Sequence, residues 1–181
     1  MINIINGIQI KKLIQTKELI FTTIFVALSV LTPMVFHFFG GINAGRSFLP
    51  IHFFVLVAGL LLGWRAGLIT GLASPLISFL ISGMPVINIL PFIIIELSAY
   101  GFLAGLLRQR FNLWISLFGA IVLGRVAVLT AIFLFSNINA VNFVLSAVRD
   151  GWRWIVMQII FVPVVVKKLQ NYFIKNSPLL R

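Results

Sequence analysis

Only three carboxylates occur among the 181 residues of this chain, while 61% of its residues are hydrophobic and 18 are phenylalanine. Charged residues make up 9% of the sequence, against roughly a quarter in ordinary soluble domains. A chain so poor in polar groups cannot cover a water-facing surface. The sequence therefore predicts that lipid is its solvent, and that nearly all of the chain lies within a bilayer.

Apolar segments close to membrane-spanning length recur along the chain. A helix needs about 20 apolar residues to cross the hydrocarbon core. We expect six transmembrane helices at Leu19–Phe39, Leu49–Gly63, Ala66–Ser82, Ile89–Leu107, Leu113–Phe135 and Trp152–Val166. The predicted fold is all-α, with residues 1–181 forming a single integral membrane domain. Residues 1–17 form a cytoplasmic or interfacial segment before the first span.

The distribution of basic residues predicts the orientation. With the N-terminus inside, ten of the 14 Lys and Arg residues fall in cytoplasmic segments and three fall in outer segments. Cytoplasmic loops carry the excess of Lys and Arg in membrane proteins, so both termini are expected in the cytoplasm. Because the basic residues stand at the ends of spans, the net charge of +11 indicates topology and not nucleic-acid binding.

Glycines and serines recur at four-residue spacing within several spans. The pairs Gly59 and Gly63, Gly67 and Gly71, and Gly101 and Gly105 are examples. Small residues at this spacing let helix backbones approach closely in lipid. We expect most of them to form packing contacts inside the bundle.

Two opposite charges fall within spans. Glu96 lies roughly 10 Å below the outer end of the fourth span, and Arg125 lies roughly 15 Å below the outer end of the fifth. An intramembrane charge is costly and usually marks a partner or a site. We expect the two to pair, either as a structural link between helices or as part of a ligand site.

Three arginines in the predicted outer segments, Arg46, Arg149 and Arg153, run against the positive-inside bias. Arginine binds carboxylates and phosphates through two parallel hydrogen bonds. With Arg125, they suggest an outward-facing pocket for an anionic or partly anionic solute. His52 and the aromatic ring of Tyr100 are further candidates for this pocket. The alternatives are a capping role for His52, a local ion pair for Arg149, and packing for Tyr100.

Residues that catalysis would need are absent or isolated. The chain has no cysteine and only two histidines, and it contains no H-E-x-x-H motif. We therefore expect no catalytic residue, no metal site and no cofactor. It also lacks a G-x-x-x-x-G-K-[ST] phosphate loop, so uphill transport would need an outside source of energy.

A string of motifs resembles the substrate-binding S components of energy-coupling factor (ECF) vitamin transporters. It covers most of residues 20–170, and its main elements are Phe48-Leu49-Pro50-Ile51-His52, Ala58-Gly59-Leu60-Leu61-Leu62-Gly63, Ser82-Gly83-Met84-Pro85, Glu96-Leu97 with Tyr100-Gly101, and Gly124-Arg125. The resemblance implies a vitamin site in the outer half of a six-helix bundle, capped by the loop after the first span. It also implies a bacterial plasma membrane location and assembly with a transmembrane coupling protein and two cytoplasmic ATPases.

In the family, a small-residue A-x-x-x-A motif in the first helix contacts the coupling protein. The nearest match here is Thr23-x-x-x-Ala27, which departs from the motif at its first position.

Three other functions remain open at this point. A stand-alone secondary transporter would use Glu96 for proton coupling. An intramembrane enzyme would depend on Glu96 or His52. A membrane assembly subunit would bind no small molecule.

Overall fold

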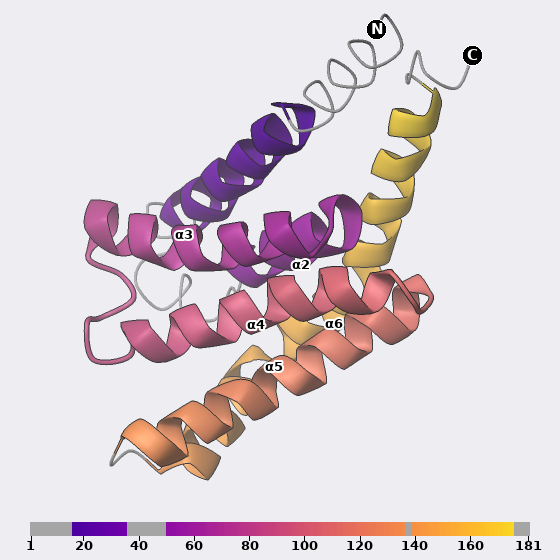
Figure 1. The fold of residues 1–181 in the computed structure, drawn as a ribbon. Helices are drawn as coiled ribbons and strands as arrows, with labels where there is room; N and C mark the ends of the chain where they lie inside the picture. Colours follow the sequence, from indigo (N-terminus) through magenta and orange to yellow (C-terminus); the bar gives the residue numbers. More distant parts are fainter. Residues whose placement is uncertain (1–15, 36–49, 137–138, 176–181) are drawn as a thin grey trace, which may run out of the picture.

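The described residues form helices joined by short connections. The computed structural model describes residues 16–35, 50–136 and 139–175 (Figure 1). The first helix is Thr16–Val35, followed by α2 (Pro50–Leu62), α3 (Trp64–Ser82), α4 (Leu90–Arg108), α5 (Leu113–Phe135) and α6 (Ala140–Lys175). No strand occurs in these ranges, and the prediction of an all-α fold is confirmed.

The membrane-spanning character is clearest for four helices. The first helix, α3, α4 and α5 are long and apolar enough to cross a bilayer, and α2 contains a shorter apolar helix at Ile51–Leu62. Large apolar side chains such as Leu80 and Phe133 are mostly exposed on the helix surfaces, as expected for contact with lipid. The chain is therefore a multi-pass membrane protein, and its six helices fit the predicted bundle.

Helix α6 differs most from the prediction. It runs for 36 residues and extends well beyond the predicted span Trp152–Val166 at both ends. At its start, the Asn139 side-chain oxygen accepts a hydrogen bond from the Asn142 backbone N–H at 2.9 Å, which caps the helix inside a stretch expected to be a loop. At its other end, Lys167 and Lys168 close the apolar run without ending the helix, because lysine is compatible with helical structure.

Helix α4 lies at the centre of the described bundle, in contact with α2, α3 and α5 (Figure 1). A Cβ atom placed on Gly59 or Gly67 would collide with the Gly101 carbonyl, and one on Gly105 would collide with the Gly63–Trp64 backbone. These contacts set α2 parallel and α3 antiparallel to α4. The predicted packing role of these glycines is confirmed, since any side chain would separate the backbones.

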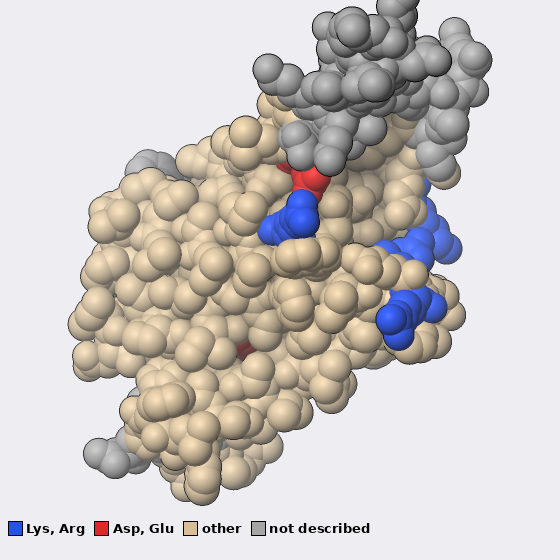
Figure 2. All heavy atoms as spheres, in the orientation of Figure 1, with Lys and Arg blue, Asp and Glu red and all other residues tan. Residues whose placement is uncertain are grey.

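The bundle has two ends, which we name by one residue each. At the Pro50 end, α2, α4 and α6 begin and α3 and α5 finish. At the Arg108 end, α4 turns into α5 and the first helix begins. Figure 2 shows Lys and Arg atoms gathered at the side where Figure 1 places the α4–α5 turn and the last turns of α6. The exposed basic residues there are Lys17, Arg65, Arg110, Lys167, Lys168 and Lys175.

We expect Gly101→Ala to destabilise the bundle strongly, because the new Cβ would meet the backbone of Gly67 and not a side chain that can move. Overpacking of this kind costs about 1–3 kcal/mol, and more where backbone must shift. Thermal unfolding in detergent measures the effect. Gly119→Ala is the matched control, since its Cβ would meet only the flexible end of Leu107. Equal unfolding temperatures for the two variants would contradict the proposed packing.

Candidate functional site

The most buried charge in the described chain is the carboxylate of Glu96, which is 1% exposed. It lies six residues into α4, or about 9 Å from the first residue of that helix. Its Oε1 atom is 2.5 Å from Arg125 Nη1 and accepts a hydrogen bond from the Tyr100 hydroxyl at 3.0 Å. His52 Nε2 lies 3.8 Å from the same oxygen. We call these four residues the Glu96 cluster.

Three helices supply the cluster. Glu96 and Tyr100 are one turn apart on α4, so they lie on the same face. His52 comes from the first turn of α2, which runs parallel to α4 and brings it to a similar depth. Arg125 comes from α5. The neighbouring Gly124 is essential here, because a Cβ at that position would overlap the Tyr100 ring.

The ion pair in the cluster carries little net charge. The side chain of Arg125 is 12% exposed and that of Glu96 is 2% exposed, so both charges are largely withdrawn from solvent. Pairing offsets much of the cost of burying two opposite charges. The pairing predicted from their similar depth is confirmed, and the arginine charge is balanced by the carboxylate.

Some polar atoms of the cluster lack partners. Among the described residues, the two ring nitrogens of His52 have no hydrogen-bond partner. The Nε atom of Arg125 has none either. Buried polar groups are nearly always hydrogen-bonded in folded proteins. The cluster therefore has unused capacity to donate and accept hydrogen bonds, which is the property expected where a polar ligand is bound.

The other predicted site residues are not part of the Glu96 cluster. Arg149 and Arg153 lie one turn apart on the exposed surface of α6, and the Arg153 guanidinium lies 5.7 Å from the Trp152 ring centroid. Arg46 falls outside the described residues, as does the rest of the predicted capping loop. Thr23 and Ala27 are both exposed on the first helix.

One contributor to the site, Gly124, and one buried contact outside the cluster, between Ser29 and Ser74, were not predicted. Gly124 admits the Tyr100 ring, and a glycine directly before an intramembrane arginine is the signal that could have indicated this. Ser29 of the first helix contacts the Ser74 hydroxyl of α3 in a buried position. Ser74 belongs to a visible series of small residues, but nothing in the sequence pairs it with Ser29.

A family model for the substrate-specific component of ECF transporters matches residues 17–174. The chain belongs to this family. No curated protein and no solved structure matches it. As an S component, it is a membrane subunit that binds a small-molecule substrate and associates with an ECF module. The family consists of transport subunits and is not a class of enzymes, which favours substrate capture over the enzymatic alternative.

We expect Arg125→Gln to lower the free energy of unfolding by about 3–5 kcal/mol, because it leaves the buried Glu96 carboxylate without its charged partner. The double variant Arg125→Gln with Glu96→Gln should recover much of that loss, since no uncompensated charge remains. Denaturant unfolding of the two single variants and the double variant measures the coupling. Additive effects would show that the two side chains do not stabilise one another.

Proposed function

We propose that this S component captures a vitamin or related micronutrient, anionic or partly anionic, in an outward-facing pocket at the Pro50 end. The observation that carries the proposal is the Glu96 cluster, in which the two nitrogens of the buried His52 ring have no hydrogen-bond partner among residues 16–35, 50–136 and 139–175. A ligand that supplies those hydrogen bonds would relieve the cost of leaving them unmade. The depth of the cluster supports a site within the bundle and not on its surface.

The charges suggest a division of roles around the substrate. Glu96 already balances Arg125, so these two offer hydrogen bonds with little net charge. A neutral polar part of the substrate, such as an amide or hydroxyl group, would suit His52, Tyr100 and this pair. The anionic part would then be bound by Arg46, with Arg149 and Arg153 attracting the solute toward the site.

The first helix supplies the proposed contact with the ECF module. The Thr23 hydroxyl donates to the Leu19 carbonyl at 3.0 Å, so its polar group is satisfied within the helix. Thr23 and Ala27 thus form an exposed, largely apolar patch of small side chains on the first helix. The exposed neighbours on this helix are Leu19, Ile20, Ile24, Leu28 and Leu31.

We propose that a transmembrane coupling protein packs on this surface and that two cytoplasmic ATPases supply the energy. The location we propose is the bacterial plasma membrane, with both termini in the cytoplasm. The Thr23–Ala27 surface then lies near the middle of the bilayer, with Thr23 toward the cytoplasmic side, because both residues are close to the midpoint of the first helix.

We expect the protein purified in mild detergent to retain its substrate, which mass spectrometry of the released small molecules would identify. Binding of that compound should weaken by about ten-fold or more in Arg46→Ala, which removes a hydrogen bond to the bound substrate, and in His52→Gln, because an amide does not reproduce the positions and directions of the two ring nitrogens. His52→Gln keeps a polar side chain of similar reach, and it leaves the ion pair between Glu96 and Arg125 in place.

The matched control is Arg65→Ala, which removes an exposed arginine at the opposite end of the bundle. Its affinity should equal that of the unmodified protein. Unchanged affinity in both Arg46→Ala and His52→Gln would overturn the proposed site, although membership of the family would stand.

We expect Thr23→Trp to prevent assembly with the ECF module and to leave substrate binding unchanged, because the large ring would separate two closely packed helices. Co-purification of the co-expressed subunits measures assembly. Thr130→Trp on α5 is a close control: Thr130 is also exposed, and its hydroxyl likewise donates to a carbonyl one turn earlier, at 2.9 Å. Assembly of both variants at normal levels would exclude the Thr23 surface as the contact.

A further inference from the structure

A pocket of about 270 Å³ that is largely open to the surroundings, which we call the cavity, lies at the Arg108 end, opposite to the Glu96 cluster. Its lining comes from the end of α2, the end of α4 and the last part of α6, and comprises Gly59, Leu60, Leu61, Leu62, Gly63, Gly105, Arg108, Gln109 and Gln170. One water occupies roughly 30 Å³ in the liquid, so the space holds a group much larger than a single water. The substrate site described above does not use it.

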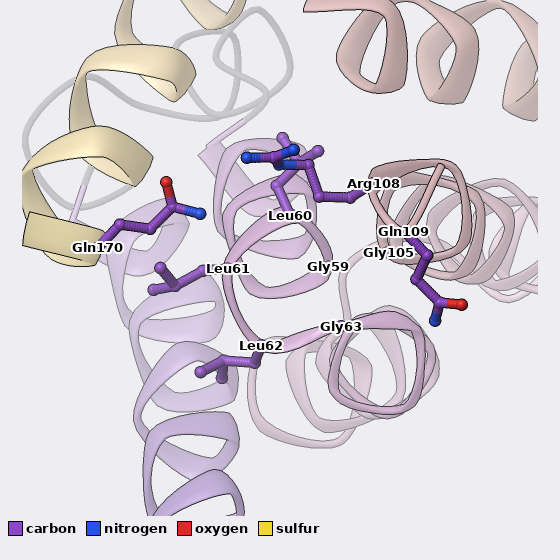
Figure 3. A pocket seen from close by; sticks show the side chains of 9 residues that line it. All are labelled: Gly59, Leu60, Leu61, Leu62, Gly63, Gly105, Arg108, Gln109 and Gln170. Carbon is purple, nitrogen blue, oxygen red and sulfur yellow. The ribbon is translucent and has the colours of Figure 1, made fainter. Parts of the chain in front are cut away.

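One side of the cavity is positive. Figure 3 shows the Arg108 side chain extending from α4 across the end of α2, while Gln170 points from α6 toward α2. Arg108 Nη1 donates to the Phe111 carbonyl at 3.2 Å, which holds the guanidinium in place. That contact uses one of its five N–H groups. The fork of an arginine beside a neutral amide donor suits a phosphate group.

The end of α2, whose last residues line the cavity, supplies carbonyl groups. The last carbonyl groups of an α-helix have no partner within the helix. At the end of α2, the Gly63 N–H donates to the Gly59 carbonyl at 3.0 Å. The next three carbonyls, those of residues 60–62, receive no such bond among the described residues. These oxygens, at the negative end of the helix dipole, suit a cation that can donate hydrogen bonds.

The depth of the cavity matches the headgroup layer of a membrane. Helix α4 has 19 residues, which gives a length of about 28 Å, close to the roughly 30 Å thickness of the hydrocarbon core. Arg108 is its last residue, so it lies where phospholipid headgroups begin. Basic pockets between transmembrane helices at this level are known to bind lipid headgroups.

We propose that this cavity binds a phosphate group joined by a short linker to a primary ammonium, as in the headgroup of phosphatidylethanolamine. The phosphate is bound by Arg108 and Gln170, and the ammonium donates to the carbonyl groups at the end of α2. The proposal does not depend on the identity of the transported substrate.

The test is native mass spectrometry of the full chain in detergent, titrated separately with phosphatidylethanolamine, phosphatidylcholine and phosphatidylglycerol of the same acyl chains. We expect phosphatidylethanolamine to bind best, because choline cannot donate hydrogen bonds and glycerol carries no positive charge. Arg108→Gln should weaken its binding about ten-fold, the loss expected for one charged hydrogen bond. Arg108→Lys keeps the positive charge but loses the planar guanidinium group. Its affinity for phosphatidylethanolamine should lie between those of the unmodified protein and Arg108→Gln.

The matched control is Arg110→Gln, since Arg110 is exposed at the same end but does not line the cavity. It should bind phosphatidylethanolamine as the unmodified protein does. An equal loss of affinity for phosphatidylethanolamine in Arg108→Gln and Arg110→Gln would overturn the proposal. Equal affinities of the unmodified protein for phosphatidylethanolamine and phosphatidylcholine would overturn it as well.

Competition by soluble phosphorylethanolamine distinguishes two sources of the same chemistry. Displacement of the lipid by this compound at equal concentration would assign the site to a soluble metabolite of that class. Lack of displacement would assign it to the membrane lipid, whose acyl chains add apolar contact.

Discussion

Contact between helix backbones at Gly101 is the constraint on which the rest of the bundle depends. In lipid, apolar side chains gain little by leaving the solvent, so helices associate through close packing and polar contacts. Gly59 and Gly67 both meet Gly101, which holds α2 and α3 against α4. The same contact fixes the depth of α2 relative to α4. His52 on α2 is therefore placed beside Glu96 on α4 by packing that lies more than a helical turn away.

The Glu96 cluster joins α5 to this framework. Arg125 of α5 reaches Glu96 across the α4–α5 contact, and the missing side chain at Gly124 lets the Tyr100 ring fill the space beside it. The ion pair thus has a structural role whatever ligand is bound. A structural role and a binding role are compatible, because the pair leaves the ring nitrogens of His52 without partners among the described residues. Packing places the site, and incomplete hydrogen bonding gives it the capacity to bind.

The sequence predicted the parts of the fold that depend on hydropathy and on glycine spacing. The span Leu113–Phe135 has the same bounds as α5, because an asparagine caps its start and a polar stretch follows its end. Helix α6 was predicted too short, since hydropathy detects the part of a helix in lipid and not its continuation into the headgroup layer. The ion pair could be predicted because two opposite charges share one depth. The contact of Ser29 with Ser74 could not, because sequence spacing does not reveal which helix faces are opposed.

The two ends of the bundle differ in whether their arginines are paired with a carboxylate, and this difference bears on transport. Toward the Pro50 end, a buried cation is matched by a buried carboxylate, so the site described there carries little net charge. At the Arg108 end, Arg108 stands beside helix carbonyls and exposed basic residues, with no carboxylate within the cavity that it lines. A subunit that changes its orientation in the bilayer must move its charged groups through or along lipid. Pairing of Arg125 with Glu96 lowers the cost of such a movement for these two buried charges.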